Sequence, residues 1–312
     1  MLAVHVVAHS HASNAYPTKP IRLIVSGAPG TPPDVVARII ADPLAAVGQP
    51  VVVEDRPGGA GTIGMSAVAK AAPDGYTLGI VGLPQMVAPS LVPHIPYDTA
   101  KDLVPVSQLT WSAQVLVVRA ASPLKTVADF VALAKAKPDQ LTYASPGNGT
   151  PSHLASELFK RQAGIEVRHV PYKGTPAALA ALLGGQLDIA FGGVATAAPL
   201  IKSGKLRALG TASVRRLPAL PDLPTIAELG FAGYHLNEWY GVVAPAGTPP
   251  EVIAKLASEL ARTLALPEVE ARLAHVGLYP AEKLGPDALG ALIRAELPRW
   301  KQIVREAGIH VD

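Results

Sequence analysis

Cysteine is absent from the sequence, and aromatic and charged residues are scarce. The 312 residues include no cysteine, 5% aromatic residues and 16% charged residues, against 49% hydrophobic ones. Without cysteine the chain has no disulfides, thiolate metal sites or cysteine nucleophile. The hydrophobic fraction excludes a disordered chain and suffices for a sizeable core. No apolar run reaches the roughly 18 residues that a membrane-spanning helix needs.

The charge of the chain is weakly positive and evenly spread. The formal net charge is +3 and the isoelectric point about 9.0. The sequence contains no block of Lys or Arg of the kind that contacts nucleic-acid phosphates, so we expect no nucleic-acid partner. A weak positive field favours small anionic ligands.

Residues 1–15 differ in character from the chain that follows. Their apolar part, MLAVHVVA, is short, and Ser13-Asn14-Ala15 resembles the small-residue cleavage site of an export signal. A signal peptide begins with a positively charged segment, which this stretch lacks. Two interpretations of residues 1–15 therefore stay open, the remnant of an export signal and a disordered head.

Short apolar runs alternate with glycine-containing loops and helical segments along the chain. Ile21–Val25, Val51–Val53 and the run TLGIVG are strand-like, with helical patterns between them. The same alternation returns in the second half, where LTYAS, EVRHVPY and QLDIAFGG are strand-like. This rhythm predicts two α/β units with mainly parallel sheets flanked by helices.

The chain is expected to cross between these two units twice. VPVSQLT and QVLVVRA read as strands in an extended stretch, and the two crossovers are expected near Val104–Gln114 and Asn237–Val243. The helical segments after Pro249 lack strands of their own, so we expect them to pack on the first unit. Two lobes joined by two crossovers form a hinged cleft. The expected boundaries are residues 16–106 with 238–312 for lobe one and 107–237 for lobe two.

The stretch GAGTIG has the glycine spacing of a dinucleotide-binding turn. Such a turn requires an acidic residue about 20 positions later, at the end of the next strand. That strand ends in IVGLPQM, without a carboxylate. We therefore interpret Gly59, Gly61 and Gly64 as a tight helix entry. A nucleotide- or phosphate-using α/β enzyme remains the alternative function.

Two further loops each lead from a strand into a helix. In SGAPGTPPD, the first loop, backbone N–H groups at the helix start favour an anion, and Asp34 either caps the helix or orients the loop. YASPGNGTPSH repeats the arrangement in the second unit, where His153 caps, contacts the ligand or merely packs. Two such loops on either side of a cleft predict an anion site.

Other polar residues do not form a catalytic constellation. Asp188 lies inside an apolar strand, where it either anchors neighbouring loops or contacts a ligand. Gly192 and Gly193 allow the backbone to approach a ligand closely. The G-x-S-x-G motif, a paired Ser–His–Asp set and His/Asp/Glu clusters with metal spacing are all missing from the sequence.

The ordered motifs resemble one receptor family. YPTKPIRLIV, the APG loop and Asp34 resemble the start of mature Bug-type receptors, the periplasmic solute-binding proteins of tripartite tricarboxylate transporters. The resemblance continues in order through VVVEDRPGGAGTIG, PDGYTL, LTYASPGNGTPSHLASELF, HVPYKGTPAALAALLGGQLDIAF and WYGVVAPAGTP. It implies a two-lobed Venus-flytrap fold, no catalysis and neither cofactor nor metal. It also implies a periplasmic monomer that delivers a dicarboxylate, amino acid or aromatic acid to the membrane subunits of a transporter.

The resemblance also implies which residues hold the ligand carboxylate between the lobes. They are Ala28, Pro29, Gly30, Thr31, Ser145, Gly147, Asn148, Gly149, Thr150 and Asp188. The chain departs from the family pattern at Ser26-Gly27, at Thr31-Pro32-Pro33 and in the segment GLPQM. These departures change the shape of one side of the cleft, so the ligand is left open.

Overall fold

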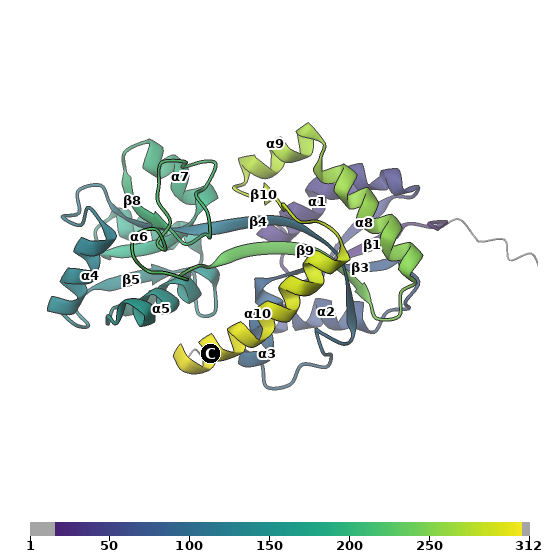
Figure 1. Cartoon of the computed structure of the whole chain (residues 1–312), viewed down its shortest axis with the longest axis horizontal. Helices are drawn as coiled ribbons and strands as arrows, with labels where there is room; N and C mark the ends of the chain where they lie inside the picture. Colours follow the sequence, from purple (N-terminus) through teal and green to yellow (C-terminus); the bar gives the residue numbers. More distant parts are fainter. Residues whose placement is uncertain (1–15, 308–312) are drawn as a thin grey trace, which may run out of the picture.

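Two long strands carry the chain between two α/β lobes in the computed structural model, which describes residues 16–307 (Figure 1). One lobe holds β1 to β3 and the other holds β5 to β8, while β4 and β9 run through both. The expectation of an export-signal remnant or a disordered head concerns residues 1–15, which lie outside the described residues. The expected two-lobed α/β fold is confirmed.

All strands belong to one ten-stranded sheet with the order β2-β1-β3-β9-β4-β7-β5-β6, and β8 and β10 also pair with β4. Pairing is parallel between β1 and both β2 and β3, and between β5 and both β6 and β7. It is antiparallel wherever β4 or β9 takes part. The bounds are β1 Ile21–Val25, β2 Val51–Asp55, β3 Thr77–Gly82, β4 Leu103–Arg119, β5 Thr142–Ser145, β6 Arg168–Pro171, β7 Ile189–Gly193, β8 Leu206–Thr211, β9 Asn237–Pro245 and β10 Tyr279–Pro280.

Strand β4 is one element of 17 residues, where the sequence predicted two strands. Its first part pairs with β9 in lobe one, and its last part pairs with β7 and β8 in lobe two. The register with β9 shifts between Pro105 and Ser107 and again between Gln108 and Thr110. Polar residues lie at these irregularities, close to where the sequence predicted one strand to end and the next to begin. Pairing on both sides keeps β4 continuous.

The helices pack on the sheet, and each begins after one of its strands except α9, which follows α8. Their bounds are α1 Pro32–Leu44, α2 Thr62–Ala69, α3 Leu83–Leu91, α4 Val127–Ala136, α5 Pro151–Ala163, α6 Thr175–Leu183, α7 Val194–Lys202, α8 Pro250–Leu264, α9 Pro267–His275 and α10 Pro286–Ala307, with short 3₁₀ turns at Ala45–Val47 and Gly59–Gly61. Helix α3 was not expected from the sequence. Within residues 16–307, no helix combines the length and the apolarity needed to cross a membrane.

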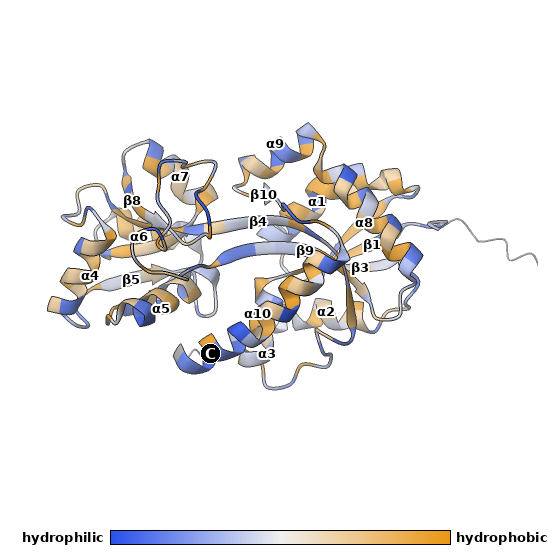
Figure 2. Ribbon diagram, viewed as in Figure 1, coloured by the Kyte–Doolittle hydropathy of each residue, from blue (hydrophilic) through white to orange (hydrophobic). Residues whose placement is uncertain are grey.

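The C-terminal helices pack on lobe one, as expected, but α10 also reaches lobe two. Helices α8 and α9 contact α1, whereas α10 contacts α3, β4 and α5. Figure 2 shows hydrophobic and hydrophilic residues alternating along α8 and α10. On α10, Trp300 is fully buried and Glu306 forms an ion pair with Arg161 of α5. The amphipathic pattern predicts a buried face, and only the fold decides that it covers both lobes.

Candidate ligand-binding site

A cavity of about 530 Å³ lies between the lobes and is lined by both. Lobe one contributes Ser26 and Gln85, lobe two contributes Thr150 and Ser152, and the crossing strands contribute Gln114, among other residues. Pockets of this size bury most of the surface of a small ligand. The hinged cleft expected from the sequence therefore encloses a space suited to a small molecule.

Many helices begin at this cavity. Helices α1, α2, α3, α5, α6 and α7 each contribute their first residues or their N-cap to its wall. The start of a helix carries a partial positive charge and N–H groups without intrahelical partners. Among the described residues that line the cavity, none is Lys or Arg. An anion in the cavity would therefore be stabilised by the backbone at the helix starts rather than by cationic side chains.

The two predicted anion loops have the same internal structure. In lobe one, the Gly30 N–H donates to Asp34 Oδ2 at 2.8 Å, and the Thr31 hydroxyl donates to the Ala28 carbonyl at 2.6 Å. In lobe two, the Gly149 N–H donates to His153 Nδ1 at 3.1 Å, and the Thr150 hydroxyl donates to the Gly147 carbonyl at 2.7 Å. In each loop, the glycine N–H is thus hydrogen-bonded to a side chain of the helix that follows the loop.

This structure separates the predicted site residues into two groups. Thr31 and Thr150 line the cavity. The other loop residues lie beside them and shape the loops without lining the cavity; they are Ala28, Pro29, Gly30, Ser145, Gly147, Asn148 and Gly149. Asp188 accepts hydrogen bonds from the Thr142 N–H and hydroxyl, at the opposite end of β5 from the loop. Of the two roles that the sequence left open for Asp188, this geometry is that of an anchor.

Asp34 binds the first loop and is itself held by Arg38. Asp34 is 3% exposed and forms an ion pair with Arg38 at 2.6 Å, while Arg38 also donates to Asp55 at 2.7 Å. Burial and repulsion from Asp34 raise the pKa of Asp55, and the Arg38 guanidinium partly offsets this rise. The role expected for Asp34 in orienting the loop matches these contacts.

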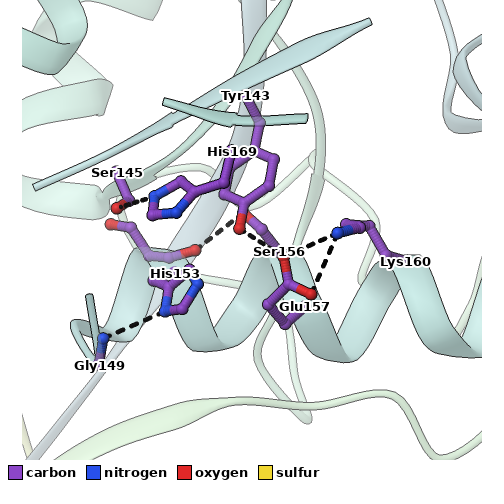
Figure 3. Close-up of polar contacts among 9 residues, drawn as sticks. Tyr143, Ser145, Gly149, His153, Ser156, Glu157, Lys160 and His169 are labelled. Atoms are coloured by element: carbon purple, nitrogen blue, oxygen red, sulfur yellow. Dashed lines mark hydrogen bonds and ion pairs between the residues drawn. The ribbon is translucent and has the colours of Figure 1, made fainter. Parts of the chain in front are cut away.

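Stacked imidazole rings hold the second loop (Figure 3). The His153 and His169 rings lie 4.4 Å apart, and Tyr143 stacks on His169 at 4.7 Å. His169 Nε2 lies 2.6 Å from the Ser145 hydroxyl, so the stack contacts both ends of the loop. Burial lowers the pKa of His153, and burial together with repulsion from His153 lowers the pKa of His169 to about 4.

The crossing strands supply a polar chain that the sequence analysis did not identify. The Ser152 hydroxyl of α5 donates to Gln114 Oε1 at 3.0 Å, and Gln114 Nε2 donates to Glu238 Oε1. All three residues line the cavity. Burial raises the pKa of Glu238, and the bond from Gln114 partly offsets this. The sequence signal that could have revealed this chain was the presence of Gln114 and Glu238 inside the two predicted crossover segments.

The GAGTIG stretch forms a tight helix entry, as interpreted from its sequence. A Cβ atom at Gly64 would lie 2.6 Å from Ser26 Oγ and 3.0 Å from the Arg56 carbonyl oxygen. Gly61, with φ of +88°, packs against Ser26 and Gln85 and lines the cavity. These glycines therefore bring α2 close to the sheet.

Among residues 16–307, no cluster of three or more His, Cys, Asp or Glu residues could hold a metal ion.

Comparison with known proteins agrees with this architecture. Residues 36–309 match the family model described as tripartite tricarboxylate transporter family receptor. Protein BugT of Bordetella pertussis is 37% identical over 310 residues, which cover 98% of this chain and 95% of BugT.

Two solved structures from Rhodopseudomonas palustris are similar along their whole length. Rpa4515 with adipate has 34% identity and a TM-score of 0.79, covering 95% of this chain and 100% of that one. MatC with bound malate has 34% identity and a TM-score of 0.76, covering 93% of this chain and 100% of that one. The chain therefore belongs to the receptor family of tripartite tricarboxylate transporters, whose members are solute-binding proteins and not enzymes.

Proposed function

We propose that this protein binds a small carboxylate between its lobes and delivers it to the membrane subunits of a tripartite tricarboxylate transporter. The observation that carries the proposal is the convergence of helix N-termini from both lobes on one cavity. Backbone N–H groups and helix dipoles stabilise an anion without a cationic side chain. The relatives solved with adipate and malate support a carboxylate as the ligand.

The proposed direct contacts from the predicted loops are Thr31 and Thr150, one from each lobe. Each hydroxyl donates to a carbonyl of its own loop, and in this proposal it turns to donate to the ligand carboxylate on binding. The remaining loop residues, Ala28, Pro29, Gly30, Ser145, Gly147, Asn148 and Gly149, position these two hydroxyls and the helix starts. The lobes are assigned residues 16–106 with 238–312 and residues 107–237. A ligand that bridges both loops gains contacts only when the lobes are closed, and therefore shifts the population toward the closed form.

The remaining parts of the proposal concern where the receptor works. We assign it to the periplasm, because relatives such as BugD are periplasmic binding proteins. We further propose that it acts as a monomer. The closed form would then be the shape that the membrane subunits recognise. Delivery can be tested by measuring uptake of the ligand in cells that carry the membrane subunits with and without this receptor.

A thermal-shift screen of carboxylic acids tests the binding function. A ligand present at 100 times its dissociation constant stabilises the folded state by roughly 2.7 kcal/mol. We expect at least one carboxylate among adipate, malate, aromatic acids and amino acids to raise the melting temperature clearly. A shift with NAD or ATP and none with any acid would support the alternative enzyme and overturn the proposal.

Two substitutions test the placement of the site. Thr150→Val removes a hydroxyl from the cavity wall, and Gly30→Val strains a loop position with φ of +79°. Each is expected to weaken binding of the acid found in the screen by about three- to tenfold. Gly233→Val is the matched control, because it has φ of +77° and equally open space but lies outside the cavity. Unchanged affinity in both test variants, measured by calorimetry, contradicts the placement.

A further inference from the structure

Glu238 introduces a carboxyl group into a cavity that is otherwise suited to an anion. It lies on β9, directly opposite Ser112 of β4. Among the described residues that line the cavity, Glu238 is the only carboxylic acid, and neither Lys nor Arg is present. The cavity wall therefore carries one acid without a cationic partner.

The orientation of Glu238 is fixed by residues from two other elements, α5 and β4. Ser152 donates to the oxygen of the Gln114 side-chain amide, and this leaves the amide nitrogen facing Glu238 Oε1. Gln114 is 4% exposed and Ser152 is 4% exposed, so neither side chain is free to turn toward solvent. The amide presents a donor to Glu238, which suits an ionised carboxylate. The chain of bonds thus holds the acid in place before any ligand binds.

The environment leaves this carboxylate incompletely compensated. Gln114 is the one hydrogen-bond donor that reaches it among residues 16–307, and that donor is neutral. Much of the surrounding wall is apolar, including Ile80, Leu83 and Trp239. A partly buried charge without an opposite charge is unfavourable, and a ligand that supplies the opposite charge removes that penalty.

We propose that Glu238 receives the ammonium group of a zwitterionic ligand. The ligand carboxylate then faces the helix N-termini, and an apolar body contacts the prolines and aliphatic side chains of the wall. The ligand class that fits all three features is an amino-carboxylate with an apolar side chain. This inference rests on the carboxylate-receptor function proposed above and specifies which carboxylates are preferred.

Matched ligands that differ only at one group test the assignment. The probes are leucine, 2-hydroxy-4-methylpentanoate and 4-methylpentanoate, together with phenylalanine and 3-phenylpropanoate. In the wild-type protein, calorimetry is expected to show each amino acid binding roughly 10- to 100-fold more tightly than its deaminated analogue. The hydroxy acid should fall between the two, because it offers a neutral donor.

The substitution Glu238→Gln tests the residue itself. It keeps the size of the side chain and removes the charge, so the preference for the amino acid is expected to fall to within about threefold of unity. Binding of adipate should become tighter, because the negative charge of Glu238, which repels the adipate carboxylates, has left the cavity. The control is Glu259→Gln on α8, a buried glutamate outside the cavity, which should leave both values unchanged.

Each outcome separates this inference from the general function. If deaminated acids or adipate bind the wild type as tightly as the amino acids, or if Glu238→Gln retains the preference, the role of Glu238 is wrong and the carboxylate receptor stands. If none of the acids binds the wild-type protein, the proposed function itself is wrong. Far-ultraviolet circular dichroism and the melting temperature of the empty variant establish that it folds, so that lost binding is not mistaken for unfolding.

Discussion

Acidification is expected to destabilise the protein through His169, which lies under the second loop. Burial and repulsion from His153 lower the pKa of His169 from 6.5 to about 4. Below about pH 6.5 the unfolded chain therefore binds a proton that the folded chain rejects. The stability that this group contributes is full above that pH, falls between pH 6.5 and 4, and falls no further below pH 4.

The size of this effect follows from the two pKa values. At about pH 5 the unfolded ring, with a pKa of 6.5, is largely protonated, whereas the folded ring, with a pKa of about 4, is largely neutral. This difference corresponds to about 2 kcal/mol of lost stability. The ring is only partly buried, so screening by solvent reduces the expected loss to about 1 kcal/mol.

Urea unfolding at about pH 7.5 and about pH 5 measures the loss. In His169→Asn the side chain still forms hydrogen bonds but does not titrate, so the loss between the two pH values should be smaller by about 1 kcal/mol than in the wild type. His94→Asn, at an exposed position outside the stack, is the control. An equal loss in wild type and His169→Asn refutes the reasoning.

Three further substitutions test other contacts. Gly277→Val should hold the lobes apart, because a Cβ atom there would lie 2.7 Å from the backbone nitrogen of Ala195 in α7. We expect at least tenfold weaker ligand binding and a larger radius of gyration in X-ray scattering. Gly285→Val is the control, and unchanged values in Gly277→Val would contradict the prediction. Trp300→Ala should lower the free energy of unfolding by about 3–5 kcal/mol in urea titrations, because the ring is fully buried; a loss below 1 kcal/mol would show that α10 does not stabilise the core. Gly64→Ala should cost about 1–3 kcal/mol in the same titrations, because of its contact with Ser26; a neutral effect argues against the tight packing of α2.

The two anion loops illustrate what local sequence can predict. The strings PGTPPD and NGTPSH each place a glycine, a threonine and a proline at the start of a helix, and the structure confirms a helix at each. Local rules apply because capping and turn formation depend on neighbouring residues. Which donors remain for a ligand was not predictable, since the N–H groups of Gly30 and Gly149 are bound by the side chains of Asp34 and His153.

The crossing strand β4 illustrates the opposite case. The sequence predicted two strands in this stretch, and pairing with β9, β7 and β8 joins them into one continuous strand. Glu238 and Gln114 are 124 positions apart in the sequence, yet they form a hydrogen bond in the cavity. No local pattern specifies such a contact, because it depends on the pairing of distant strands.

The sequence by itself determined the α/β class, the two-lobed plan, the loop–helix starts and, through its ordered motifs, the receptor family. These features depend on periodicity, on residues close together in the chain and on the order of motifs along it. The tertiary structure alone decided which helix starts meet at the cavity, that Asp188 lies at the far end of β5, and that Glu238 faces the ligand space. Those outcomes depend on how separate elements pack, because packing brings together side chains whose positions in the sequence are unrelated.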